Sequence, residues 1–206
     1  MTSPPAGRPW EVVFLARHGQ TEWNVVRRRQ GHLDSPLTAA GIAQARRHGT
    51  ALRGCGVDGI FASPMGRALT TARIIGAAIS RDVAGVDVEV VDDLAEIDHG
   101  EFSGLVDEQI DARYPGARQR RAADKYRWRF PGGESYADAD VRAARVLQQL
   151  SRRPARRPLI VAHEMIGRML QRHLLGLDPH LAVCQTHPHD VVYRIDPAGR
   201  QREPLA

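Results

Sequence analysis

Short apolar runs alternate along the chain with stretches whose apolar residues recur at helical spacing. The runs are rich in β-branched residues and have the length of buried strands, and they occupy residues 12–15, 59–62, 86–91, 158–162 and 191–195. The helical spacing predicts helices over residues 38–53, 65–79, 135–150 and 166–175, with Thr38 and Ser135 as N-terminal caps. Alternating strands and helices predict an α/β fold of three layers (αβα), in which helices cover both faces of a mostly parallel central sheet. The last strand, followed by a polar tail, is expected to close the sheet at its edge.

The pattern loosens between residues 101 and 133. A short helix around Ile110 is expected there, and basic residues surround Tyr126, Trp128 and Phe130. The stretch is too short to bury a core of its own, so we interpret it as a small helical cap insertion over the crevice that holds the active site. Residues 10–206 are accordingly predicted to form a single domain, preceded by a disordered, Pro-rich leader at residues 1–9.

Chemically reactive residues follow four of the predicted strands. Arg17 and His18 follow the first strand, Arg67 the second, Glu96 the third and His163 the fourth. In an open α/β sheet, ligands bind beyond the carboxyl ends of the strands, so these side chains are expected to meet in one crevice. Taken singly, each has an ordinary alternative: a satisfied core histidine, an arginine that reaches solvent, or a glutamate on an exposed loop.

The position of each residue favours a particular kind of chemistry. A cation in the first turn of a helix opposes the helix dipole, so a bound anion explains Arg67 better than helix stability does. His163 lies at a helix N-terminus, where backbone donors attract anions. Glu96 is expected to be an isolated carboxylate in partly apolar surroundings, which holds a proton at neutral pH as a general acid requires.

Composition narrows the class of protein. The formal net charge is +5, but Lys125 is the single lysine among 29 basic residues, and the basic clusters are not interleaved with aromatic residues that could stack on bases. A basic surface or an anionic small-molecule substrate therefore explains the charge better than nucleic acid does. No apolar run is long enough to span a bilayer, and Cys55 and Cys184 fit free thiols, so we expect a soluble cytoplasmic protein without a membrane partner.

The sequence lacks the common metal and nucleotide motifs. Neither HExxH, nor a Cys/His finger pattern, nor a P-loop is present. His187-Pro188-His189 is interpreted as a loop rather than as a pair of metal ligands. No metal and no cofactor are expected.

The reactive residues belong to an ordered series of motifs. The series consists of Arg17-His18-Gly19 with Thr21 and Asn24, Gln30-Gly31, Ser63-Pro64 with Arg67, Glu96 with Gly100 and Gly104, and Val161-Ala162-His163. Over residues 12–175 this series resembles the histidine phosphatase superfamily. It looks most like the branch that contains cofactor-dependent phosphoglycerate mutases and broad-specificity phosphatases.

The resemblance implies a role for each matching residue. His18 would be the nucleophile that accepts the phosphoryl group, and Glu96 would be the proton donor. Arg17, Arg67 and His163 would hold the phosphate oxygens. Further positions that contact substrate or phosphate would be Asn24, Gln30, Gly31 and Glu164. Because His18 must attack as the neutral ring, a backbone carbonyl is expected to hold its other nitrogen.

Two residues depart from the family's pattern. Glu164 stands where relatives usually have glycine, and a carboxylate there repels a phosphate dianion unless it turns away or pairs with an arginine such as Arg168. Ser103 stands where many relatives have glutamate, a change expected to affect only the rim of the site.

The resemblance implies a metal-independent phosphomonoester hydrolase that acts through a phosphohistidine on a small phosphorylated metabolite. One alternative is a cofactor-dependent phosphoglycerate mutase, which is less favoured because the mutases of the family are generally longer. Another is a non-catalytic sensor of a phosphorylated ligand. The identity of the substrate and the oligomeric state, a homodimer included, stay open.

Overall fold

The computed structural model of the chain describes residues 10–80 and 87–205. The leader predicted at residues 1–9 and the first residue of the strand predicted at 86–91 lie outside the described residues.

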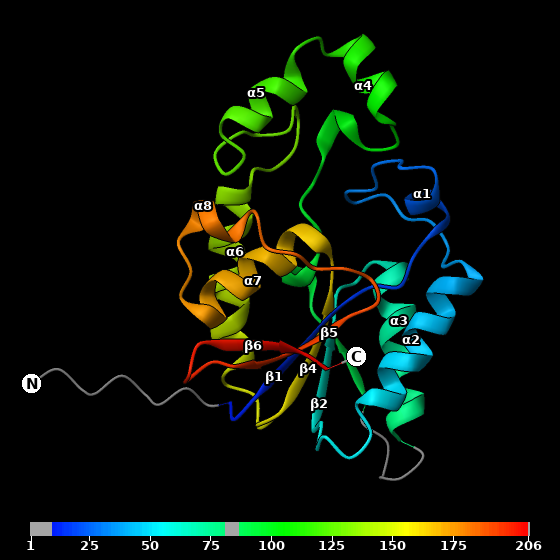
Figure 1. The fold of residues 1–206 in the computed structure, drawn as a ribbon, viewed down its shortest axis with the longest axis vertical. Coiled ribbons are helices and arrows are strands. Elements are labelled where there is room, and N and C mark those ends of the chain that lie inside the picture. Colours follow the sequence, from blue (N-terminus) through cyan, green and yellow to red (C-terminus); the bar gives the residue numbers. More distant parts are fainter. Residues whose placement is uncertain (1–9, 81–86, 206) are drawn as a thin grey trace, which may run out of the picture.

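Six strands of the described residues form one mixed sheet in the order β3-β2-β4-β1-β5-β6 (Figure 1). The parallel strands are β1 (Val13–Arg17), β2 (Gly59–Ala62), β3 (Val88–Val90) and β4 (Pro158–Ala162). Strand β5 (Val192–Asp196) pairs antiparallel with β1, and β6 (Gln201–Pro204) pairs antiparallel with β5. The α/β fold with a mostly parallel central sheet is thereby confirmed.

The edge of the sheet differs from the expectation. Strand β5 does not close the sheet, because β6 pairs along its outer side. The sequence Gln201–Pro204 has no apolar run, and its side chains are mostly exposed, so hydrophobic periodicity does not reveal it. Arg200, with φ of 53°, turns the chain back into this pairing. Strand β6 is held by backbone hydrogen bonds rather than by burial.

Four longer helices follow the strands as predicted. They are α2 (Ala39–Ala51), α3 (Gly66–Ile79), α6 (Tyr136–Leu150) and α7 (Glu164–Leu175). The hydroxyl of Thr38 accepts the Gly41 N–H at the start of α2, and Ser135 with Asp138 forms a capping box on α6. Two single-turn helices, α1 (Glu22–Val25) and α8 (Pro179–Ala182), lie in the connections, as do 3-10 turns at Asp92–Leu94 and Gly100–Phe102. No helix in the described part of the chain is long and apolar enough to cross a membrane.

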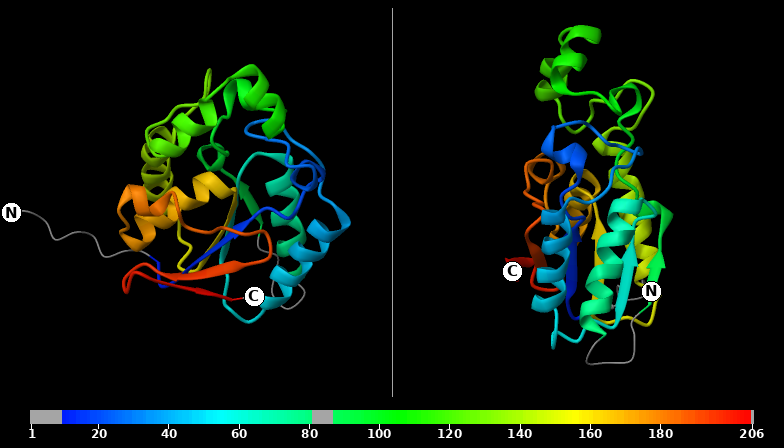
Figure 2. Two further views of the ribbon diagram at one scale, coloured as in Figure 1. Left: turned by 45° about the horizontal axis from the view of Figure 1, so that its top comes forward. Right: turned by 90° about the vertical axis from the view of Figure 1, so that its right-hand side faces the viewer.

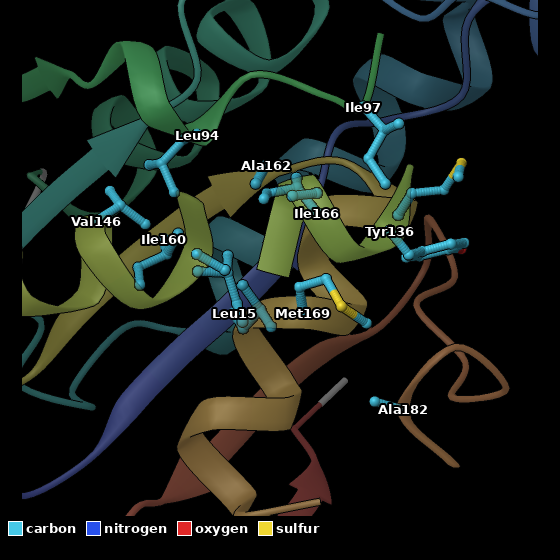
Figure 3. Packing of buried hydrophobic residues seen from close by; sticks show 14 of the residues in the cluster. Leu15, Leu94, Ile97, Tyr136, Val146, Ile160, Ala162, Ile166, Met169 and Ala182 are labelled. Atoms are coloured by element: carbon cyan, nitrogen blue, oxygen red, sulfur yellow. The ribbon is translucent and has the colours of Figure 1, made fainter. Parts of the chain in front are cut away.

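The sheet separates two hydrophobic clusters. Because side chains alternate along a strand, Phe14 and Ala16 of β1 face α2 and α3, whereas Val13 and Leu15 face α6 and α7. Figure 3 shows the second cluster, in which Leu15 lies among side chains of β4, α6 and α7. Burial on both faces explains why the central strands read as continuous apolar runs. It also fixes the ends of these strands rigidly.

Residues 101–133 form two short helices outside the three layers. Helices α4 (Asp107–Arg113) and α5 (Ala117–Ala123) lie at one end of the molecule in both views of Figure 2. Backbone bonds between Arg29 and residues 104 and 105 tie the start of this segment to the loop after α1. Phe102, Ile110 and Phe130 join the cluster under α6 and α7. The segment shares the core of the sheet instead of forming its own; its role as a cap stays a prediction.

Candidate active site

The carboxyl ends of β1, β4 and β2 lie side by side and present three polar residues. His18 follows β1, His163 follows β4, and Ser63 follows β2. Backbone hydrogen bonds between the neighbouring chains continue one residue past the strands. The His18 N–H donates to the Ala162 carbonyl, and the Ser63 N–H donates to the Val161 carbonyl. As a result, the centroids of the His18 and His163 rings are 5.2 Å apart. The two histidines, 145 positions apart in the sequence by their numbers, thus meet at one edge of the sheet.

His18 is a buried, neutral imidazole. Its Nδ1 lies 2.8 Å from the Gly19 carbonyl oxygen, which can only accept, so Nδ1 carries the proton and Nε2 keeps its lone pair. Burial, followed by repulsion from Arg17 and Arg67, lowers the pKa of His18 well below its ordinary value. The carbonyl contact expected from the sequence is present. The ring has the form that a nitrogen nucleophile needs.

His163 is held in a defined tautomer by Ser63. Its Nε2 lies 2.7 Å from the Ser63 hydroxyl, which accepts the Met65 N–H. Among the described residues Nε2 is the acceptor that the hydroxyl hydrogen can reach, so Ser63 donates to the ring. Nδ1 then carries a proton, and it has no hydrogen-bond partner among the described residues. Burial and the charge of Arg67 lower the pKa of His163 well below its ordinary value. His163 thus offers one unsatisfied N–H donor.

Arg67 is fixed by the loop that precedes α2. Its guanidinium pairs with the Asp34 carboxylate at 2.9 Å and donates to the Gly31 and Leu33 carbonyls. Asp34 also accepts the backbone N–H of Arg67 at the start of α3. Asp34 therefore compensates the helix dipole beside Arg67, so this cation in the first turn of α3 has a structural explanation within the protein. Its binding of an anion stays a prediction. The Nε atoms of Arg67 and Arg17 are both buried without a partner in the described residues.

Glu164 pairs with two arginines. Its carboxylate lies 3.1 Å from Arg17 and 2.5 Å from Arg168, which is one turn further along α7. Burial favours the neutral form of Glu164, but Arg17 and Arg168 outweigh it and hold its pKa below the ordinary value. The pairing with Arg168 considered at the sequence level is present, and Arg17 joins it. In this arrangement the negative charge of Glu164 is neutralised by neighbouring guanidiniums.

Glu96 is not the isolated carboxylate expected from the sequence. It accepts three backbone N–H bonds, from Ile97, Met165 and Ile166, at 2.9 to 3.1 Å. Two of these donors belong to the first turn of α7, where N–H groups lack partners within the helix. Its apolar neighbours Leu94 and Ile97 belong to the hydrophobic cluster of α6 and α7, whereas the oxygens of Glu96 accept from backbone donors.

The remaining predicted contact residues lie on the loop after β1. Asn24 caps α1 together with Thr21, and the Gln30 amide donates to the Thr21 hydroxyl at 2.9 Å. Gly31 has φ of +52°, and its carbonyl accepts from Arg67. This backbone conformation favours glycine, so the residue has a structural reason to be there.

All of the predicted site residues except one line a single pocket of about 360 Å³. The exception is His163, whose side chain is fully buried beside His18. The basic residues of the lining are Arg17, Arg27, Arg28, Arg29, Arg67, Arg121, Lys125 and Arg168. Glu96 and Glu164 are the acidic ones, so the pocket is strongly positive. No cluster of three or more metal-ligating side chains occurs within residues 10–80 and 87–205.

Several residues beside the site were not predicted. Arg121 and Lys125 come from the 101–133 segment, whose aperiodic sequence does not show which of its basic residues face the pocket. His189 lies with its ring 5.1 Å from that of His18, and His187 bonds to the backbone of His163. The His187-Pro188-His189 motif does lie in a loop, as interpreted, but the loop returns to the site.

Comparison with known proteins agrees with this arrangement. The model of the histidine phosphatase superfamily (branch 1) matches residues 13–204. A protein named "probable phosphoglycerate mutase" from Enterobacter sp. (strain 638) is 37% identical over 166 residues, which span 80% of this chain and 75% of that protein.

Solved structures of phosphatases have the same fold. A mycobacterial glucosyl-3-phosphoglycerate phosphatase in complex with VO3 is 28% identical, with a TM-score of 0.78 over 94% of this chain and 97% of that one. The alpha-ribazole phosphatase from Shigella flexneri is 25% identical, with a TM-score of 0.81 over 94% of both chains.

The buried histidines make folding stability dependent on pH. Burial lowers the pKa of His99 and of His187 to about 3, whereas an unfolded histidine titrates near 6.5. Below about pH 6.5 the unfolded chain therefore binds protons that the native protein does not. The free energy of unfolding consequently decreases as the pH is lowered. We expect a loss of about 1.4 kcal/mol per pH unit for each such histidine, continuing towards about pH 3.

Denaturant unfolding from neutral pH down to about pH 5 measures this loss. The variant His99→Phe keeps a ring stacked on Phe130 but cannot titrate. It should reduce the slope of unfolding free energy against pH by the contribution of one histidine. Unfolding free energies that stay constant over this range would contradict the expectation.

Proposed function

The chain belongs to branch 1 of the histidine phosphatase superfamily, and from this premise we propose that it hydrolyses a small phosphomonoester through a phosphohistidine formed on His18. The family and its phosphatase neighbours make the chain a phosphatase. One observation carries the proposed mechanism: Nδ1–H of His18 is held by the Gly19 carbonyl, which leaves the Nε2 lone pair beside Arg17, Arg67 and His163.

In the first step, Nε2 of His18 attacks phosphorus while the bond from phosphorus to the ester oxygen breaks. Charge on the other phosphate oxygens is met by Arg17, Arg67 and the free Nδ1–H of His163. These groups are already oriented by protein contacts, so little rearrangement is needed as charge develops. In the second step, water attacks the phosphohistidine and releases inorganic phosphate and the neutral ring.

Glu96 is the proposed proton carrier. The departing alkoxide needs a proton, and the attacking water must lose one, so a single carboxyl group can serve both steps in turn. The three N–H donors hold Glu96 at the pocket wall, where it lies among the residues that line the space next to His18.

Phosphoglycerate mutase activity is a second candidate. The relative from Enterobacter, which is named for that activity, favours it. Both activities would use the same phosphohistidine, so the fate of the phosphoryl group distinguishes them. Transfer to water gives a phosphatase, and transfer back to a bound product gives a mutase.

We further propose that the substrate carries a second anionic group. Arg121 lies over the Phe130 ring and Lys125 over the Tyr136 ring, and neither has a carboxylate at ion-pair distance in the described residues. Burial lowers the pKa of both groups. Lys125 donates to the Val183 carbonyl, which carries no charge, so both cations are partly buried without a counter-ion and favour an anion. In the proposed mechanism the phosphate itself is met by Arg17 and Arg67.

Turnover should depend on His18 and not on a metal ion. We expect the protein to hydrolyse 4-nitrophenyl phosphate in the presence of EDTA, and His18→Ala to lower kcat at least about 10³-fold because the proposed covalent step is made by the ring of His18. Mass spectrometry after a base quench should find phosphate on His18. The exposed His180→Ala is the control and should keep wild-type turnover. Undiminished hydrolysis by His18→Ala would refute the proposal.

Glu96→Gln should discriminate between leaving groups. An alkyl phosphate needs protonation of its leaving oxygen, whereas an aryl phosphate needs little, so the alkyl ester should be slowed much more. Comparing kcat/KM for the two substrate classes measures this difference, with the exposed Glu108→Gln as the control. Equal slowing of both classes would reject the role of Glu96 as an acid.

Arg121→Gln should affect substrates according to their charge. For phosphomonoesters that carry a carboxylate or a second phosphate, we expect KM to rise about tenfold or more, the effect of losing a charged hydrogen bond. KM for 4-nitrophenyl phosphate should stay near the wild-type value. Its exposed neighbour Arg120→Gln is the matched control. A rise of the same size for both substrates would contradict a second anion site.

A further inference from the structure

We propose that His187 and His189 are positioning residues, which hold the backbone of the two site histidines so that His18 and His163 keep their places around the phosphate. The proposal rests on the phosphatase mechanism given above and adds two residues that take no part in its chemical steps. Both lie in the loop between α8 and β5, far along the chain from His18.

His187 holds the backbone of His163. Its Nδ1 lies 3.1 Å from the His163 carbonyl oxygen, and the ring is buried. The same carbonyl accepts the Gly167 N–H, which is the first helical bond of α7. His187 thus bonds to the residue at which strand β4 ends and α7 begins.

His189 holds the backbone of His18 in the same manner. Its Nδ1 lies 2.6 Å from the His18 carbonyl oxygen, and its ring stands edge-on to the His18 ring. The carbonyl of His189 in turn lies 2.9 Å from Nε2 of His48, a buried residue of α2. The end of β1 is thereby tied through His189 to the helix on one face of the sheet.

The nitrogen that makes each contact is defined. A carbonyl oxygen only accepts, so both rings carry their proton on Nδ1. Burial, then the charge of Arg17, lowers the pKa of His187 to about 3 and that of His189 to about 4, so both rings are neutral at physiological pH. Each ring therefore donates one N–H to the backbone and leaves Nε2 as an acceptor.

The rest of the loop is anchored to the same elements. Three successive carbonyls accept side-chain bonds: that of Gln185 from Arg168, that of Thr186 from Gln171, and that of His187 from Arg17. Arg168 and Gln171 belong to α7, and Arg17 ends β1. The loop consequently bridges the two strand ends that carry His18 and His163.

Gly167 gives independent support for the place of His187. A Cβ atom at Gly167 would lie 2.0 Å from Nδ1 of His187, so any side chain there would displace the ring. Glycine inside a helix costs about 1 kcal/mol relative to alanine. The chain nevertheless has glycine at this position of α7, where the imidazole ring packs directly on the helix backbone.

Asparagine and glutamine replacements test the role of each nitrogen. The amide of asparagine can replace the Nδ1–H donor, whereas that of glutamine reaches the place of Nε2. We expect His189→Asn and His187→Asn to keep kcat near the wild-type value. The corresponding glutamine variants should lose about 10²-fold in kcat, the cost of a misplaced nucleophile, with little change in KM for 4-nitrophenyl phosphate.

The matched control is the exposed His180, for which the asparagine and glutamine variants should behave alike. Equal losses for both replacements at 187 and at 189, or no loss for either, would overturn the proposal. A purely structural role would lower the melting temperature without this difference in kcat. If the wild-type protein shows no turnover, the proposed function fails. The positioning role is then decided by the imidazole ¹⁵N shifts of His18, which should change in His189→Gln but not in His189→Asn.

Gly167→Ala tests His187 without altering it. The added methyl group should displace the ring and lower kcat as His187→Gln does. In the His187→Ala background, the same change should have no further effect on kcat, because no ring is left to displace. Equal losses from Gly167→Ala in both backgrounds would show that the helix, and not the histidine, is responsible.

Discussion

The parallel pairing of β1 with β4 is the constraint on which the site depends. It places the residues after Arg17 and Ala162 next to each other, and burial on both faces of the sheet prevents the strand ends from shifting. Two buried imidazoles therefore lie side by side, close to the guanidiniums of Arg17 and Arg67. In that environment the neutral form of each ring is favoured, because a third and fourth positive charge would lack both solvent and counter-ion. The neutral form of His18, with its proton on Nδ1, is thus a result of the fold.

Bringing Arg17 and Arg67 into one buried site costs free energy, and this cost is offset by carboxylates that pair with them. Asp34 neutralises Arg67 from the loop before α2, and Glu164 neutralises Arg17 from the first turn of α7. A buried cation without such a partner would be strongly destabilising. Each carboxylate also fixes the orientation of its guanidinium. The same ion pair therefore both stabilises the buried arginine and sets its position at the pocket. The arginine-rich pocket is consistent with a stable fold for this reason.

Hydrophobic periodicity was sufficient to predict the fold and insufficient for several contacts. The strands β1, β2 and β4 and the helices α2, α3, α6 and α7 are buried on one or both faces, and burial is what such a pattern records. Strand β6 is polar and exposed, so it left no signal. The strand ends predicted the convergence of His18, Arg67, Glu96 and His163, although the assignment of their roles rests on the family.

The directions of individual side chains could not be predicted from the sequence. The residues next to Glu96 in the sequence suggested an apolar environment. Its oxygens instead accept N–H bonds from the first turn of α7, which is formed by a distant part of the chain. His187 and His189 were visible as a motif, but nothing local indicates that their loop returns to the strand ends. Such contacts depend on how loops close over the sheet, and loop closure is not encoded in the spacing of apolar residues.

The Glu164 bridge has a consequence for the end of the catalytic cycle. Arg17 and Arg168 each form an ion pair with a carboxylate that belongs to the protein. In the mechanism proposed above, a phosphate ion would share Arg17 with this tethered carboxylate, and its release would return Arg17 to an ion pair that the protein already holds. Glu164 would thereby keep a buried guanidinium from being left without an anion between turnovers.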